Sequence, residues 1–117
     1  MTEYQRVTVE EVGDFRIVRF RDPHLTDAWE IENLGQELYR LVEQEERKHL
    51  ILDFSSVQML SSAAFGKLIS LHGKVKARGG VMKLCNIRPE LFDTFRICRL
   101  DRFFNITQDI DDAMAPF

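Results

Sequence analysis

This sequence of 117 residues has few of the features that mark metal-binding or membrane proteins. Its two cysteines, Cys85 and Cys98, do not lie in a Cys-x-x-Cys or Cys/His spacing, so we expect no metal site. Both stand in apolar surroundings, which predicts two small core residues. No apolar run approaches the ~18 residues of a membrane span, and the acidic start of the chain is unlike a signal peptide. The sequence therefore predicts a cytoplasmic protein that does not insert into a membrane.

The sequence also has no excess of basic over acidic residues, and catalytic motifs are scarce. The formal net charge is -3, whereas nucleic acid binding needs a concentrated basic face. The sequence contains no G-x-S-x-G elbow, no glycine-rich phosphate loop and no H-E-x-x-H pair, and its three histidines are scattered. We therefore expect no enzymatic activity, no catalytic residue, no cofactor and no nucleic acid partner.

Length and composition indicate one globular domain over residues 1–117. The hydrophobic content of 44% and the charged content of 30% are ordinary for such a domain. A chain of this length buries roughly 65% of its unfolded surface, which is enough for a single core. No internal repeat, linker or low-complexity segment divides the chain.

The order of apolar patterns predicts an α/β fold. Alternating residues on both sides of Gly13-Asp14 predict an N-terminal β-hairpin, and Trp29 is expected to pack in the core or at its edge. Residues 21–25 and 55–58 are expected to be connections. Further elements are predicted as a helix over 26–46, a strand over 49–54, a helix over 61–78, a strand over 81–85, a helix over 89–100, a strand over 103–106 and a last helical turn capped by Thr107 or Asp109. The expected fold is a mixed β-sheet with an N-terminal hairpin and about four helices covering it.

Two serines, Ser61 and Ser62, stand where the central predicted strand hands over to a helix. A serine at this position ordinarily caps the helix and contributes about 1 kcal/mol, and this structural role remains an alternative. However, one cap needs only one hydroxyl, and the alanines at 63 and 64 leave room for another surface to approach. The carboxyl end of a central strand is also where open α/β sheets place their functional sites. His72 lies about 15 Å from Ser62 by helix rise, too far to activate it as a nucleophile.

The run from Ser61 to Gly66, SSAAFG, carries a resemblance to a known family. With Gly79-Gly80 at the helix end and the turn 86–89, NIRP, it resembles the STAS domain of bacterial anti-anti-sigma factors, whose signature reads D-S-S-G-L-G or D-S-S-A-L-G. The resemblance covers most of the chain and is strongest from about residue 49 to 106. It implies that residues 1–117 form a single STAS domain.

The resemblance also implies a phosphorylation switch at Ser62. In that family the first serine after the aspartate accepts a phosphate from a partner kinase that is itself the anti-sigma factor. Here Ser62 takes the position of that phosphoacceptor, while Ser61 replaces the aspartate. The implied function is that of an anti-sigma factor antagonist, which binds the serine kinase while Ser62 is free and is reset by a serine phosphatase. The residues expected to contact the partner are Asp27, Ser61, Ser62, Ala63, Phe65 and Lys67.

The missing aspartate leaves a second hypothesis open. With Ser61 in its place, the chain could be a STAS adaptor that is not phosphorylated and works in a sensory assembly or beside a transporter. Because the sequence shows no obvious second apolar face, we expect a monomer when the partner is absent.

Overall fold

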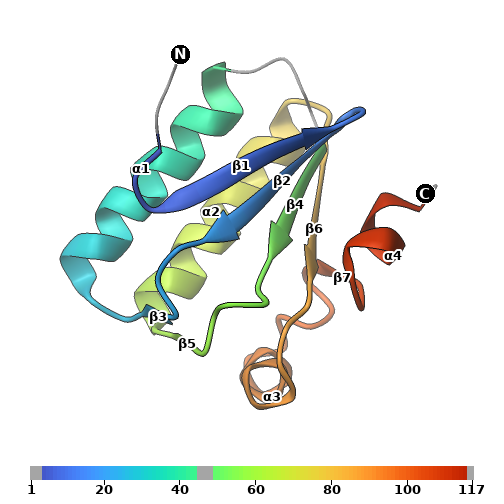
Figure 1. Ribbon diagram of the computed structural model, residues 1–117. Helices are drawn as coiled ribbons and strands as arrows, with labels where there is room; N and C mark the ends of the chain where they lie inside the picture. The colour runs from blue at the N-terminus through green and yellow to red at the C-terminus, as the bar shows by residue number, and fades with distance from the viewer. Residues whose placement is uncertain (1–3, 45–48, 116–117) are drawn as a thin grey trace.

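The computed structural model describes residues 4–44 and 49–115, in which four helices surround a twisted sheet (Figure 1). In chain order the elements are β1 Val7–Val12, β2 Phe15–Phe20, β3 His24–Leu25, α1 Ala28–Gln44, β4 His49–Asp53, β5 Met59–Leu60, α2 Ser62–Ala77, β6 Val81–Cys85, α3 Pro89–Ile97, β7 Asn105–Ile106 and α4 Ile110–Met114.

The N-terminal hairpin forms as predicted. β1 and β2 pair antiparallel, with Val7 opposite Phe20 and Val12 opposite Phe15. Gly13 in the two-residue loop has a φ of 57°, a left-handed conformation that tight hairpin turns require and that glycine adopts without strain. The hairpin thus forms one edge of the main sheet.

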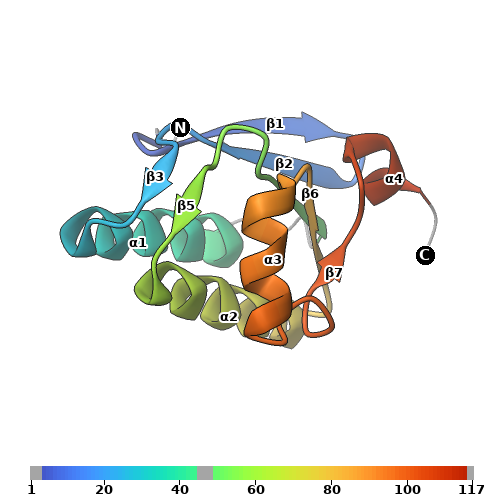
Figure 2. The same ribbon diagram turned by 90° about the horizontal axis from the view of Figure 1, so that it is seen from below.

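The main sheet has the order β1-β2-β4-β6-β7, with every neighbouring pair parallel except the hairpin. α1 and α2 lie side by side and cover one face of this sheet (Figures 1 and 2). Because α4 packs on the opposite face, the central strands are buried on both sides and read as nearly continuous apolar runs. The expected mixed sheet with its hairpin and four helices is confirmed.

Side chains of the central strand β4 divide between two cores. Leu52 packs in one cluster with Leu38 of α1 and Leu71 of α2, and all three are fully buried. Ile51 points to the other face, where it packs with Ala113 of α4. Each fully buried aliphatic side chain contributes about 1.5–3 kcal/mol, so these contacts fix the helices on the sheet.

A second, two-stranded sheet was not predicted. β3 lies inside the first expected connection, residues 21–25, and β5 directly follows the second, residues 55–58. The two strands pair in parallel, with Leu25 opposite Leu60. The carbonyl of Pro23 accepts the amides of Gln58 (2.7 Å) and Met59 (3.2 Å). Strands of two residues are too short to show a periodic pattern, and their pairing joins segments far apart in sequence. The small sheet draws the starts of α1 and α2 to the same end of the molecule (Figure 2).

The helix ends agree with the sequence analysis only in part. α2 ends before Gly79, whose φ is 77°, as predicted from the glycine pair. α3 stops at Ile97 rather than at Leu100, because Arg99 adopts a left-handed φ of 60° and the amide of Leu100 bonds back to the carbonyl of Phe95 (2.8 Å).

Two residues expected in the core or at its edge, Cys98 and Trp29, lie at the surface. Cys98, the cap residue that follows α3, is exposed because it lies beyond the inward face formed by Leu91 and Phe95. Cys85 is buried as expected, and this burial raises the pKa of its thiol to about 12. Trp29 is 68% exposed because it precedes the inward face of α1, and its ring stacks against the guanidinium of Arg6 at 5.1 Å.

Candidate functional site

Ser61 is the N-cap of α2 and uses its hydroxyl inside the protein. Its backbone is extended (φ −83°, ψ 169°), and its Oγ accepts the amide of Ala64 at 3.3 Å. Its own amide donates to the carbonyl of Leu25 in β3 at 3.0 Å. The capping interaction contributes about 1 kcal/mol to the helix, so the structural role considered for the serine pair belongs to Ser61.

Ser62 is the first residue of α2, and it is exposed. Within the described part of the chain its hydroxyl has no hydrogen-bond partner, in contrast to that of Ser61. Ala63 beside it is also exposed, so no large neighbouring side chain at that position covers the hydroxyl. The free N–H groups and the positive end of the helix dipole make this position favourable for a negatively charged group.

Phe65 does not belong to the surface around Ser62. Its side chain is only 7% exposed and packs edge-on against Phe95, with ring centroids 5.0 Å apart. It lies on the inward face of α2 with Ala64 and Leu68. The expectation that Phe65 contacts a partner from the surface is therefore wrong, and Phe65 instead anchors the start of α2 in the core.

Lys67 borders the site, but its ammonium group forms an ion pair with Glu32 of α1. Its Nζ lies 2.8 Å from Oε2 of Glu32, and this hydrogen bond raises the pKa of Lys67 and lowers that of Glu32. The stem of Lys67 passes over Gly35, where an added Cβ would lie only 2.8 Å from the Cδ of the lysine. Lys67 therefore joins the two helices, and its ammonium is directed to α1.

Asp27 is the N-cap of α1, with its Oδ1 accepting the amide of Glu30 at 2.9 Å. It is exposed and lies two residues after the end of β3, just as Ser62 lies two residues after the end of β5. Because β3 and β5 pair in parallel, the starts of α1 and α2 lie at the same end of the molecule (Figure 2). The structure thus brings Asp27, Ser61, Ser62 and Ala63 to one end of the molecule, and their contact with a partner stays a prediction.

Two exposed apolar residues near Ser62 were missed by the sequence analysis. Met59 in β5, three residues before Ser62, is 55% exposed, and Ile69 is 39% exposed. Ile69 lies seven residues after Ser62 and so on the same face of α2. Its exposure could not be recognised without knowing which side of the helix meets the sheet.

A buried carboxylate, also missed, anchors the loop that leads to this site. Asp53, 3% exposed at the end of β4, accepts hydrogen bonds from the amide of Ser55 (2.9 Å), Nδ2 of Asn86 (3.0 Å) and Nε of Arg19 (3.1 Å). Burial by itself would raise the pKa of Asp53, but these hydrogen bonds together outweigh it and lower the pKa. The sequence signal was an aspartate that ends an apolar strand.

The arrangement offers an exposed hydroxyl at the start of a helix. Among the described residues, no group of three or more histidine, cysteine, aspartate or glutamate side chains is placed to hold a metal ion. None of the described helices combines the length and the apolar character needed to span a membrane. What the site can offer is a set of exposed uncharged residues on α2 around Ser62, bordered by Asp27 and Lys67, and a place for an anion at a helix start.

Comparison with known proteins agrees with this architecture. The family model described as STAS domain matches residues 6–113. An anti-sigma factor antagonist from Mycobacterium paratuberculosis superposes with a TM-score of 0.79 at 21% identity, over 92% of this chain and 89% of that chain. The Bacillus cell fate determinant SpoIIAA in its phosphorylated form gives 0.67 at 17% identity, over 90% of this chain and 94% of that one. A chain from the stressosome, a signal integration and transduction hub, gives 0.68 at 17% identity, over 92% of both chains. At these identities the three structures show a shared fold.

Proposed function

The chain belongs to the STAS domain family, and we propose that it is an anti-sigma factor antagonist switched by phosphorylation of Ser62. In this proposal it is a binding module without catalytic activity. It holds an anti-sigma factor, itself a serine kinase, while Ser62 is free, and a sigma factor is thereby released. The kinase transfers the γ-phosphoryl group of ATP to the Ser62 Oγ, ADP leaves, and a serine phosphatase later removes the phosphate.

The observation that carries the proposal is that the two neighbouring serines differ in their hydrogen bonding. Ser61 caps α2, whereas the hydroxyl of Ser62 is exposed and unbonded within the described residues. A phosphate on Ser62 would therefore break no internal hydrogen bond of the described structure. Because it would sit at a helix N-terminus, it would be favoured by about 0.3–1 kcal/mol.

The same phosphate would strongly oppose docking. It adds about −1.5 to −2 charges and three acceptor oxygens to a helix start whose exposed residues, Ser62 and Ala63, are small and uncharged. A partner shaped for a hydroxyl would have to desolvate that charge, and a cost of ~3–4 kcal/mol lowers affinity roughly 100- to 1,000-fold. The cost at the interface exceeds the gain at the helix, so phosphorylation releases the partner and leaves the fold intact.

The direct experiment mixes the purified protein with its kinase and ATP and follows intact mass. We expect one added phosphate on the wild type and on Ser61→Ala, and none on Ser62→Ala. Ser62→Asp should bind the kinase at least 100-fold more weakly than the wild type. Phosphate on Ser62→Ala, or undiminished binding by Ser62→Asp, would disprove the switch.

A second candidate function rests on Ser61, which stands where the resembled signature has an aspartate. A STAS adaptor within a larger sensory assembly would use the same exposed end of the molecule without phosphorylation. Intact-mass measurement of protein isolated from its native cells separates the two candidates. A species that stays unmodified under all growth conditions favours the adaptor, whereas a phosphorylated fraction that changes with conditions favours the switch.

A further inference from the structure

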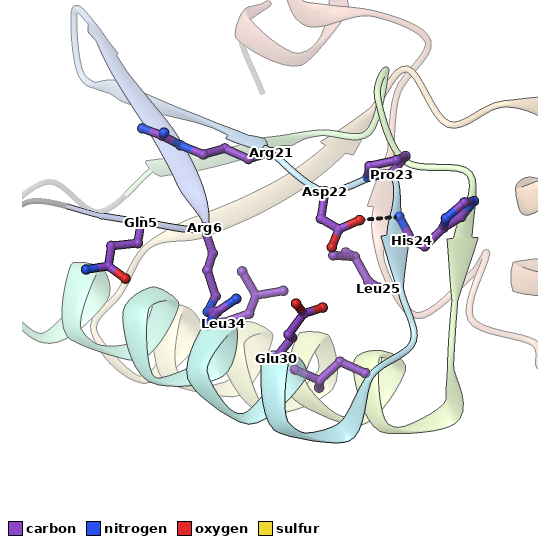
Figure 3. A pocket seen from close by; sticks show the side chains of 10 residues that line it. Gln5, Arg6, Arg21, Asp22, Pro23, His24, Leu25, Glu30 and Leu34 are labelled. Atoms are coloured by element: carbon purple, nitrogen blue, oxygen red, sulfur yellow. Dashed lines mark hydrogen bonds between the residues drawn. The ribbon is translucent and has the colours of Figure 1, made fainter.

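A cavity of about 280 Å³ lies between the end of β2, β3 and the first turns of α1, separate from Ser62 (Figure 3). Its base is apolar, formed by Leu25, Ile31 and Leu34, which are 8%, 2% and 5% exposed. The volume is near the lower end of the ~300–1,000 Å³ of small-ligand pockets, so the cavity fits a group of a few heavy atoms.

Two carboxylates stand over this apolar base. Asp22 and Glu30 reach into the cavity from opposite walls, one from the connection after β2 and the other from the first turn of α1 (Figure 3). Asp22 accepts the backbone amide of His24 at 2.9 Å, which orients its carboxylate. Within residues 4–44 and 49–115, neither carboxylate forms an ion pair with a basic side chain.

Neither of the two arginines in the cavity wall forms an ion pair with these carboxylates in the described part of the chain. The side chain of Arg21 extends away from both of them (Figure 3). Arg6 is engaged by Glu37, whose Oε1 accepts the Arg6 amide at 3.1 Å and whose Oε2 lies 3.9 Å from the Arg6 Nε. Its guanidinium also stacks on Trp29 at 5.1 Å. The cavity therefore combines an apolar base with two carboxylates that form no ion pair among the described residues, beside two arginines that are directed elsewhere.

We propose that this cavity binds one guanidinium or ammonium group carried on a short aliphatic stem. The methylene groups of the stem would cover Leu25, Ile31 and Leu34, and the cation would lie between Asp22 and Glu30. Side chains and ligands of this kind bury an apolar stem while their charged tip is hydrogen-bonded, and hydrogen bonds between a cation and a carboxylate are among the stronger ones in proteins. The chemistry is the same for a free small molecule and for an arginine or lysine side chain.

The test is a titration of the full chain with butylguanidinium, followed by ¹H–¹⁵N and methyl NMR. We expect chemical shift changes at Leu25, Ile31 and Leu34, and at least tenfold weaker binding of butylurea, which has a similar shape but no charge. Asp22→Asn and Glu30→Gln should each weaken binding of butylguanidinium at least tenfold. Glu43→Gln, which removes a charge from the same helix outside the cavity, should leave binding unchanged.

Two results would overturn the proposal. Butylurea that binds as tightly as butylguanidinium would mean that the cavity selects only an apolar group. Shift changes that spare the cavity, or that are insensitive to both carboxylate variants, would mean that the cation binds elsewhere.

A second experiment distinguishes the two sources of the cation, and it uses an acetylated, amidated Ala-Arg-Ala peptide with its citrulline counterpart as the control. Arginine-specific binding tighter than that of butylguanidinium identifies a protein side chain as the source, and weaker binding identifies a free ligand.

Discussion

α1 and α2 are two helices of 17 and 16 residues that pack on the same face of one sheet but present different surfaces outward. Beyond the exposed Ala28 and Trp29 of its first turn, the exposed residues of α1 up to residue 43 are charged or polar: Glu32, Gln36 and Glu43. Between residues 62 and 73 of α2, every exposed residue is uncharged: Ser62, Ala63, Gly66, Ile69, Ser70 and Gly73.

This difference indicates that the two outward faces have different tasks. A solvated helix face ordinarily carries charge, as that of α1 does. A face of small and uncharged residues is hydrated more weakly than a charged one, and each glycine within a helix costs about 0.5–1 kcal/mol relative to alanine. The outward face of α2 therefore supports the proposal that a partner docks along it from Ser62 onward.

The largest expected effect lies on the inward faces, where the two helices should behave alike. Leu38 of α1 and Leu71 of α2 are both fully buried in the same cluster. Truncation of either to alanine should lower the free energy of unfolding by about 2–5 kcal/mol, through lost burial and a residual cavity. Chemical denaturation measures both variants, and a large difference between them would show that one helix dominates the core.

The next largest effect is on partner binding, and it should differ between the outward faces of α2 and α1. Ile69→Glu places a charge on the surface proposed to dock and should weaken kinase binding about 100-fold or more, since an unpaired charge must be desolvated. Because Ile69 is 39% exposed, the free energy of unfolding should change by only about 0.5 kcal/mol. Gln36→Glu on α1 is the matched control and should bind as the wild type does. Equal weakening by both variants would remove the distinction between the faces.

A smaller effect concerns the connections that lead into the helices. The pKa of Asp53 is lowered in the folded protein, so its contribution to stability is fully present above the unfolded value of 3.8 and is lost as pH falls through the folded pKa. Loss of charge-assisted bonds to Ser55, Asn86 and Arg19 should cost on the order of 2 kcal/mol. The protection of the Ser55 amide against hydrogen exchange, taken relative to the intrinsic exchange rate at each pH, should fall in acid, and Asp53→Asn should weaken this pH dependence. Protection that stays unchanged down to about pH 2 would contradict it.

The sequence predicted those elements whose ends and faces follow from local periodicity and from helix-capping residues. The hairpin, the start of α2 at the serine pair and its end at Gly79 follow from local patterns. The β3–β5 sheet, the burial of Phe65 and the exposure of Ile69 depend on which elements meet in space. A stripe of apolar residues on α2 therefore could not reveal that one of its members faces outward.

The smallest expected effect compares glycines on the two helices. An added Cβ at Gly66 or Gly73 meets nothing within 4 Å, so alanine at either position should raise the free energy of unfolding by about 0.5–1 kcal/mol. At Gly35 of α1 the Cβ would press on the Cδ of Lys67 at 2.8 Å, so Gly35→Ala must displace the lysine that pairs with Glu32 and should give no such gain.

Chemical denaturation of the three alanine variants measures this difference, and kinase binding by Gly66→Ala completes the comparison. If the partner approaches the helix closely at Gly66, the stabilised variant should bind more weakly, since the added methyl group occupies the space of a partner atom. Gly73→Ala, two turns further along the helix, provides the reference for distance from Ser62. A gain in stability at Gly35 equal to that at Gly66 would show that Lys67 yields freely. The contact between α1 and α2 would then not require glycine at position 35, and the two helices would differ only in their outward faces.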